Sequence, residues 1–267
     1  MPRKLLITIL TAASLVVGCD TATPVLEPDV VVVRGFLYAG EPVRNIQLTT
    51  TSPVEATEEV GQPITDVPVV LFQNADTNYF FLTPQPGQPG MYHYDGDDLR
   101  VKIGDEFLLS VDYQGRQIIA TTDIPEEPQG VVLSETRVFV EADSGEEEIV
   151  LTIAWDNPEG QLHWVSIHNI EADPVPIRQE NAEIDPAHPI QSEPITDLFF
   201  QVKAGQFTHY GTHEVKVYRI SSNYFALYQF AQHPVRRIYE PDTGIDNGVG
   251  IFAGLSGVRY TITVLPP

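Results

Sequence analysis

Several separate runs of this chain alternate apolar with polar residues, and this two-residue period constrains the fold more than any other feature. The alternation holds over 107–114, 149–155 and 258–265. Because successive side chains of a strand point to opposite faces, such runs predict strands with one buried face. Short strands that turns separate predict a mostly β chain built of sandwiches, not a βαβ arrangement. The turn signals between the runs are Asp95-Gly96, Gln114-Gly115, Ser144-Gly145, Asn247-Gly248 and Ser256-Gly257.

Two sandwich domains are expected, because a proline-rich, charged segment interrupts the strands near the middle of the chain. Pro125-Glu126-Glu127-Pro128 lies between a strand that ends near Thr122 and one that starts near Val131. Such a composition is typical of a connection between domains. We therefore expect two immunoglobulin-like or fibronectin-like β-sandwiches, an N-terminal one over 29–125 and a C-terminal one over 129–267.

One segment departs from the strand pattern and predicts a short helix near 222–232 in the second sandwich. Ser221-Ser222-Asn223 can cap a helix, aromatic residues follow at helical spacing, and Pro234 would end it. We expect this helix to cover an open end of the sandwich. Its aromatic stripe could instead be a platform for a ligand, although such stripes more often belong to a core.

The N-terminus has the three parts of a lipoprotein signal. Arg3 and Lys4 give a positive start, residues 5–17 carry no charge, and Gly18 precedes Cys19. This 13-residue apolar run suits a signal peptide and is too short to span a bilayer as a helix. The sequence therefore predicts a signal peptide over 1–18, lipidation of Cys19 and a tether over 19–28. The alternative is a secretory signal with an unrelated cysteine near its end.

Cys19 is the only cysteine of the 267 residues. A lone thiol in an exported chain needs an explanation, and lipidation supplies one. Acyl chains on Cys19 would hold the protein at a membrane without spanning it. The fold would then have no disulfide to support it, so core packing alone must stabilise both sandwiches.

The chain is strongly acidic, with a formal net charge of −22 at pH 7. This charge disfavours binding to nucleic acid and to anionic lipid headgroups. Hydrophobic residues make up 42% of the chain, which is enough for packed cores and argues against global disorder. Only four lysines accompany eleven arginines, a bias that either adaptation to high salt or ordinary solubility explains.

No catalytic constellation is recognisable, so we expect neither enzyme activity nor a cofactor. Gly254-Leu255-Ser256-Gly257 lacks the spacing of the Gly-x-Ser-x-Gly nucleophile elbow, and we interpret it as a hairpin turn. No glycine-rich phosphate loop follows a strand and opens a helix.

Two groups of residues are weak candidates for metal ligands, and no metal site is predicted from either. His209 and His213 are four residues apart, and the residues between them suggest that they flank a hairpin turn, with no third ligand in view. Asp95, Asp97 and Asp98 gather oxygens that suit calcium but lack the spacing of an EF-hand loop. A solvated acidic turn is the favoured interpretation of the three aspartates.

Two tryptophans and two long loops complete the set of features that could serve a function. Trp155 and Trp164 are expected in the core, with stacking on a sugar as the alternative. Residues 171–197 and 232–248 are expected to be loops, and the second contains Arg236-Arg237, a basic pair in an acidic chain. Long ordered loops are often functional, although surface excursions are about as common.

Several short motifs follow one another in an order that resembles a known family. They are the strand 30–37, the proline-led strand 63–71, the turn Pro89-Gly90-Met91-Tyr92, the hairpin 104–125, the segment 221–230 and the strand 245–254. Together they resemble the domain-of-unknown-function 4249 family of Bacteroidota lipoproteins. The N-terminal half is also similar to transthyretin-like and carboxypeptidase-regulatory-like sandwiches.

The resemblance implies an outer-membrane lipoprotein, facing the cell surface or the periplasm, that works beside a TonB-dependent transporter. The family has no known catalytic residues, so none is carried over. The leading hypothesis is a noncatalytic accessory binding protein for that transporter. The alternatives are a structural or adhesive module and a hydrolase of envelope glycan or peptide, which would need converging carboxylates or a Ser–His pair in one cleft.

Overall fold

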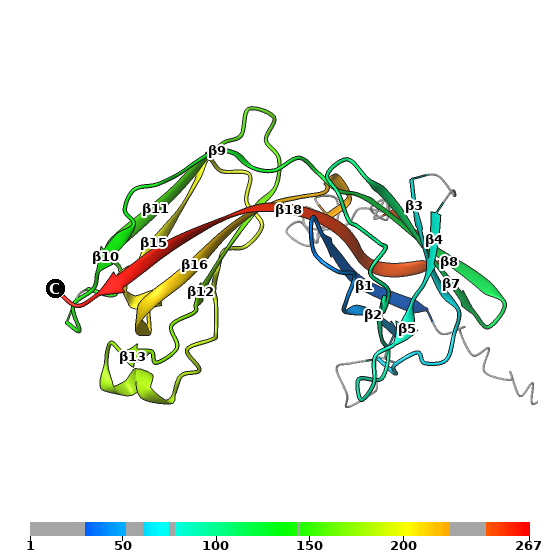
Figure 1. Ribbon diagram of the computed structural model, residues 1–267, viewed down its shortest axis with the longest axis horizontal. Helices are drawn as coiled ribbons and strands as arrows, with labels where there is room; N and C mark the ends of the chain where they lie inside the picture. Colours follow the sequence, from blue (N-terminus) through cyan, green and yellow to red (C-terminus); the bar gives the residue numbers. More distant parts are fainter. Residues whose placement is uncertain (1–29, 52–60, 75–77, 144, 225–243) are drawn as a thin grey trace, which may run out of the picture.

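The computed structural model describes residues 30–51, 61–74, 78–143, 145–224 and 244–267. Within these ranges the chain is mostly β, as the alternating pattern predicts, and it forms two sandwiches joined as an arch (Figure 1). The strands are β1 (Val31–Tyr38), β2 (Ile46–Thr50), β3 (Val69–Gln73), β4 (Asn78–Phe81), β5 (Thr83–Pro84), β6 (Met91–His93), β7 (Glu106–Tyr113), β8 (Arg116–Asp123), β9 (Gln129–Leu133), β10 (Arg137–Phe139), β11 (Ile149–Asp156), β12 (His163–Asn169), β13 (Val175–Pro176), β14 (Ile190–Gln191), β15 (Phe199–Lys203), β16 (His209–Ile220), β17 (Ile245–Asp246) and β18 (Gly248–Leu265).

Helical structure is scarce in the described part of the chain. Two 3₁₀ helices, η1 (Gln179–Glu183) and η2 (Ala204–Gln206), lie in the second sandwich. Residues 222–224 are helical, and the rest of the helix predicted near 222–232 lies outside the described residues. None of the described helices has the length and apolar character that a membrane crossing requires.

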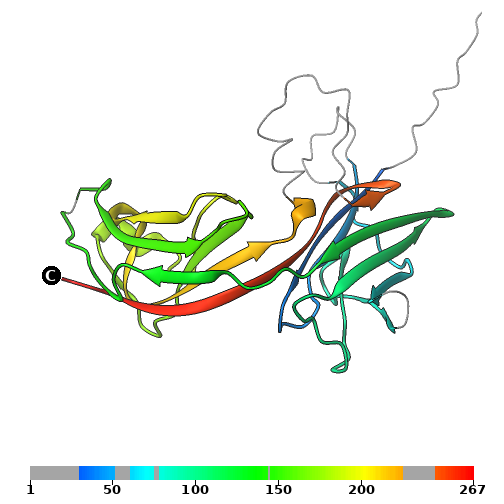
Figure 2. The ribbon, with the colours of Figure 1, turned by 90° about the horizontal axis from the view of Figure 1, so that it is seen from above.

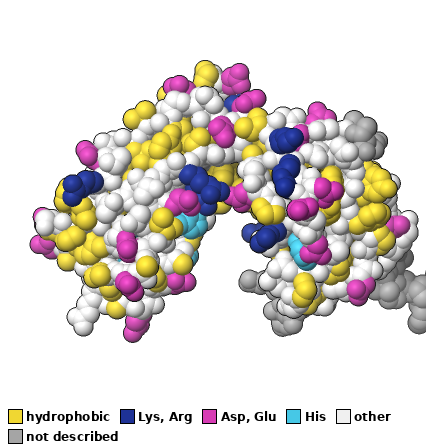
Figure 3. Space-filling view, in the orientation of Figure 1, with side chains coloured by type: hydrophobic (Ala, Val, Ile, Leu, Met, Phe, Trp, Pro, Cys, Tyr) yellow, Lys and Arg dark blue, Asp and Glu magenta, His cyan; other side chains and the backbone are white. Residues whose placement is uncertain are grey.

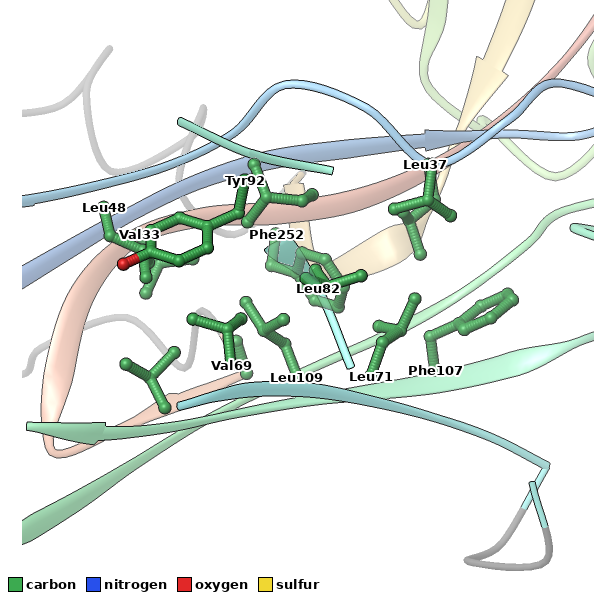
Figure 4. Packing of buried hydrophobic residues seen from close by; sticks show 14 of the residues in the cluster. Val33, Leu37, Leu48, Val69, Leu71, Leu82, Tyr92, Phe107, Leu109 and Phe252 are labelled. Carbon is green, nitrogen blue, oxygen red and sulfur yellow. The ribbon is translucent and has the colours of Figure 1, made fainter. Parts of the chain in front are cut away.

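The first sandwich packs two sheets around one apolar core. One sheet has the strand order β17-β8-β7-β3-β4, and the facing layer consists of β18, β1, β2, β6 and β5 from a larger ten-stranded sheet. Leu71 and Leu109 point from the first sheet toward Val33, Leu48 and Phe252 on the second (Figure 4). The alternation over 107–114 therefore forms β7, whose apolar positions lie in the core and whose polar positions face outward.

The second sandwich is built in the same way from the rest of the ten-stranded sheet. The three-stranded sheet β15-β11-β9 faces β14, β12, β16 and β18, and β10 pairs with β18. Leu151 and Ile153 of β11 pack with Val165 of β12, Val215 of β16 and Ile262 of β18. The alternations over 149–155 and 258–265 thus form the opposing layers of one core.

Strand β18 belongs to both sandwiches, and the predicted division of the chain differs from the observed one here. Residues 248–255 pair in parallel with β1, whereas 255–264 pair antiparallel with β16. The sequence predicted that all of 129–267 forms the second sandwich, but β17 and the first half of β18 complete the first. The reason is that a single strand, 18 residues long, continues from the first core into the second. Figure 2 shows β18 passing from one sandwich to the other.

The glycines of β18 serve close packing, which corrects the interpretation of 254–257 as a hairpin turn. A Cβ on Gly254 would lie 2.0 Å from the carbonyl oxygen of Asp123, and one on Gly257 would lie 2.5 Å from Cδ1 of Tyr218. Glycine is needed where another part of the chain approaches so closely. The expected turn at Gln114-Gly115 is confirmed, because both residues have positive φ, at 52° and 74°, between β7 and β8.

A third apolar cluster joins the two sandwiches where β18 crosses. Leu162, Ile220, Ala253 and Leu255 are buried there, and aromatic side chains pack against them. Ser256 donates its hydroxyl to the carbonyl oxygen of Glu126 at 2.7 Å, which ties the connection between the domains to β18. The junction is therefore held by apolar contact and by hydrogen bonds, in addition to the strand itself.

Candidate functional site

The two sandwiches enclose a hollow on the concave side of the arch. Strands β1, β2, β12 and β16 border it, and side chains of Lys, Arg and His gather on both of its walls (Figure 3). These strands present the face of the ten-stranded sheet that points away from the cores. The hollow therefore combines residues from both halves of the chain.

The first wall of the hollow contains a polar cleft of about 640 Å³. Two segments form it: the connection between β1 and β2, and the segment that begins with the last residue of β6. A backbone bond from Tyr94 N–H to the carbonyl oxygen of Val43, at 3.0 Å, joins the two segments. The lining residues are Gly40, Glu41, Pro42, Val43, Arg44, Gln85, His93, Tyr94, Asp95, Gly96, Asp97, Leu99, Arg100 and Val101.

Most carboxylates around the polar cleft are already bonded. Asp95 accepts the Thr83 hydroxyl at 2.8 Å and forms an ion pair with His93, and these contacts hold the pKa of Asp95 below its usual value. Asp98 accepts the Tyr94 hydroxyl at 2.6 Å, which lowers the pKa of Asp98 and raises that of Tyr94. Asp95 and Asp98 are thus held by contacts within the protein and are not free ligands.

The two arginines of the polar cleft form fewer contacts within the protein than its carboxylates do. Arg100 donates from Nη1 to the carbonyl oxygen of Leu99 at 3.1 Å. Within the described ranges, the guanidinium of Arg44 forms no ion pair or hydrogen bond, and the same is true of the Asp97 carboxylate. Both guanidinium groups therefore keep donors for a molecule from outside.

Where the two walls meet, tyrosines and charged residues form a compact group. Tyr38 packs edge-on against Tyr218, with ring centroids 5.6 Å apart, and Arg259 pairs with Glu41. Burial raises the pKa of both tyrosines, and the nearby Glu41 carboxylate raises it further. The Glu41–Arg259 pair links the first sandwich to the second half of β18.

The second wall holds a Ser–His contact of the kind that the hydrolase hypothesis requires. The hydroxyl of Ser166 and Nε2 of His168 are 2.8 Å apart on β12. Ser166 is only 1% exposed, however, and the Glu214 carboxylate opposite His168 pairs with Lys216 at 3.0 Å. Burial lowers the pKa of His168. A serine this inaccessible cannot reach a substrate carbonyl, so the pair does not form an exposed nucleophile.

His209 and His213 do not flank a hairpin turn, contrary to the sequence interpretation. Both lie in the continuous strand β16, and both are 4% exposed at the end of the second core. Residues four apart on a strand point to the same face, and burial lowers the pKa of His213. The strand continues because its alternation outweighs the weak turn signal of Gly211, which adopts a φ of 117° within β16.

The structure brings Asp95 and Asp97 into the polar cleft, with Asp98 bonded beside it. In the described part of the chain, no group of three or more His, Cys, Asp or Glu residues gathers in a way that could hold a metal ion. Cys19 lies outside the described residues, as does most of the loop 232–248 with Arg236-Arg237.

The two tryptophans and the loop 171–197 have different environments. Trp155 is 4% exposed and stacks on His163, which confirms its expected place in the core. Trp164 is half-buried at the junction, where it stacks on Tyr218 with centroids 5.5 Å apart. The loop 171–197 contains β13, η1 and β14, and Asn181 anchors it by donating to the carbonyl oxygen of Thr208 at 3.0 Å.

Sequence reasoning missed Arg44, Arg100 and the Glu41–Arg259 pair. Residues 44 and 100 lie far apart in the chain and share no motif, and their segments meet through the pairing of β2 with β6 and through backbone hydrogen bonds beyond these strands. The low lysine content showed that cations are scarce, but not where they gather.

Comparison with known proteins gives one match to a family. A family model described as "Domain of unknown function (DUF4249)" matches residues 19–261. No protein with a curated function matches the chain. Among solved structures, the chain is similar to the crystal structure of the FN1–FN3 domains of chicken CNTN1, at 10% identity and a TM-score of 0.26, over 86% of this chain and 66% of that chain. The chain thus spans slightly less than two thirds of that structure, and so low a score carries no argument.

Proposed function

The chain belongs to the DUF4249 family, whose function is unknown, and on this basis we propose that it is a noncatalytic lipoprotein of the outer membrane that binds a ligand or a protein for a TonB-dependent transporter. One observation carries the proposal. A single strand, β18, makes two sandwiches into one arch, and the concave face of that arch holds the polar cleft. A preformed concave surface with a few polar groups is the usual form of a binding site.

The proposed anchor is the lipid on Cys19. The eleven residues after Cys19 lead to β1, and an extended chain of that length reaches at most about 40 Å. The first sandwich, which contains the polar cleft, would therefore stay close to the membrane. Replacing the thiol removes the only site for the lipid, so Cys19→Ser should release a folded, soluble protein. A Cys19→Ser protein that stays tightly bound to membranes would contradict the anchor.

The role beside a transporter is tested by affinity capture of the tagged protein from native membranes of its own cells. The expected result is co-purification of a TonB-dependent transporter with the wild type. A charge reversal on the concave wall, Lys216→Glu, should reduce capture, whereas Arg137→Glu on the exposed strand β10 is the matched control. Recovery of no transporter with the wild-type protein would refute the association.

A structural or adhesive role is the second candidate, and exposed apolar residues on the outer sheets favour it. Tyr79 and Phe81 on the edge strand β4 are 60% and 62% exposed. In the second sandwich, Val132 and Phe199 flank Ala154 across three strands and are also exposed. Exposed apolar strands at a sheet edge are surfaces for self-association. Concentration-dependent oligomers that Phe81→Ser abolishes would support this role over the first.

A further inference from the structure

We propose that the polar cleft binds an oxyanion, a carboxylate or phosphate group of a ligand, through the guanidinium groups of Arg44 and Arg100. This inference names the chemistry of the ligand and rests on the proposed binding function. It concerns the charges that remain in the cleft once its internal pairs have formed.

Contacts inside the protein leave the cleft with guanidinium donors that have no acceptor. Of its acidic residues, Glu41 is paired with Arg259, and Asp95 contacts the His93 ring, which carries a charge only when it is protonated. Neither Arg44 nor Arg100 forms an ion pair or a hydrogen bond with a carboxylate among the described residues, and the Asp97 carboxylate also lines the cleft. The Arg100 charge also acts on Asp98, whose carboxylate accepts the hydroxyl of Tyr94. Two arginines with free donors thus line the cleft, beside the Asp97 carboxylate.

Guanidinium donors without a partner matter in a chain with a net charge of −22. The field of such a protein repels anions over most of its surface, so an anion gains most where unpaired cations gather. Arginine suits this task better than lysine, because its planar fork of donors matches carboxylate and phosphate oxygens and can form two parallel bonds. The cleft therefore supplies both the charge and the geometry for an oxyanion.

The backbone around the two arginines is held in place before any ligand arrives. Gly40 donates its N–H to the carbonyl oxygen of Val101 at 2.9 Å, which joins the segments that carry Arg44 and Arg100. Gln73 donates from its side chain to the carbonyl oxygen of Arg100 at 2.8 Å. The Tyr94 ring packs edge-on against Phe80, with centroids 5.2 Å apart. A site ordered in advance loses less entropy when it binds.

Asp97 should restrict the kind of oxyanion that binds. A carboxylate carries one negative charge, whereas phosphate carries between one and two at neutral pH, so repulsion by Asp97 is smaller for the carboxylate. We therefore expect a carboxylate to bind in preference to inorganic phosphate.

The test follows the side-chain Nε–H signals of arginine by NMR in the full-length lipidated protein in detergent. Sodium acetate and sodium phosphate are titrated separately, with sodium chloride at matched ionic strength. Saturable shifts of the Arg44 and Arg100 signals are expected with acetate, and Arg44→Gln or Arg100→Gln should weaken binding by about tenfold, the effect of losing a charged hydrogen bond. Arg137→Gln, an exposed arginine on β10, is the matched control and should bind as the wild type does.

A saturable shift with acetate or with phosphate supports the proposal. The anion that binds more tightly shows whether the cleft prefers a carboxylate or a phosphate group. Shifts that chloride reproduces at the same ionic strength, or equal weakening by Arg137→Gln, would overturn it. The membrane capture described above is independent of this titration. A protein that still captures the transporter but binds neither anion would refute the oxyanion site alone.

Discussion

The two sandwiches share one sheet but differ in what they bury. The first sandwich buries no histidine among the described residues, and its core includes Tyr92, which donates its hydroxyl to the carbonyl oxygen of Ile64 at 3.1 Å. The second sandwich buries three histidines, His163, His209 and His213. Burial lowers the pKa of His163 and of His213, so the stability of the second sandwich should fall in mild acid. The stability of the two sandwiches can therefore respond differently to the same change of pH.

The distribution of tryptophan allows this difference to be measured. The chain has two tryptophans, Trp155 and Trp164, and both lie in the second sandwich. Tryptophan fluorescence therefore reports unfolding of the second sandwich, whereas far-ultraviolet circular dichroism reports both. Comparing these two signals separates the stability of the first sandwich from that of the second.

Phe252→Ala should have the largest effect. Phe252 is fully buried between the sheets of the first core (Figure 4), and such truncations lower the free energy of unfolding by about 3–5 kcal/mol. In urea, the midpoint seen by circular dichroism should fall more than the midpoint seen by fluorescence. Thr261→Ala, at an exposed position of the same strand, is the control. Equal shifts of both midpoints would mean that the sandwiches unfold as one unit.

Gly254→Ala should have an intermediate effect, because the added methyl group would overlap the carbonyl oxygen of Asp123 and approach Ile124. Forcing a methyl group into a packed site costs about 1–3 kcal/mol. Both midpoints should fall, since the crossing of β18 supports both halves. Gly145→Ala has nothing within 4 Å of its new methyl group and should leave both midpoints unchanged. A Gly254→Ala protein as stable as the wild type would refute the close-packing role.

Acidification should selectively weaken the second sandwich. Burial, aided by the charge of Arg219, lowers the pKa of His163 from 6.5 to about 4. The unfolded chain therefore takes up a proton below pH 6.5 that the folded chain refuses until about pH 4, so stability falls as the pH falls through this window. Linkage gives a loss on the order of 1 kcal/mol at pH 5.5, and at most about 3 kcal/mol by pH 4.

The measurement compares urea midpoints by fluorescence at pH 7.5 and pH 5.5. The midpoint should fall at the lower pH, and His163→Gln should reduce this dependence because it removes the titrating group. His213, whose pKa is also lowered, contributes in the same direction and accounts for part of what remains. If His163→Gln had the same pH dependence as the wild type, His163 would not be the source.

Arg259→Gln should have the smallest effect. Its ion pair with Glu41 is partly exposed, and such pairs contribute less than about 1 kcal/mol. The loss should shrink further in high salt, where the charges are screened. Thermal unfolding at low and high salt measures this loss of stability. A loss above about 2 kcal/mol would mean that the ion pair holds the two halves of the arch together.

The parts of the fold that the sequence predicted are those governed by neighbouring residues. Strand β7 and the turn at Gln114-Gly115 follow from a period of two and from residues that accept positive φ. Trp155 was placed correctly in the core for the same reason, since it continues the alternation of β11. The candidate aspartates Asp95 and Asp97 were found, but as a solvated acidic turn and not as part of the lining of a cleft.

By itself, the sequence determined that this chain is mostly β, that it forms two sandwiches and that it belongs to its family, because each rests on local pattern or on the order of motifs along the chain. Only the tertiary structure decided that β18 serves both sandwiches, that His209 and His213 lie buried in one strand, and that Arg44 and Arg100 share a cleft. The physical reason is the same in each case. Pairing between distant strands decides which residues meet, and an alternating pattern states which face of a strand is buried but not which partner covers it.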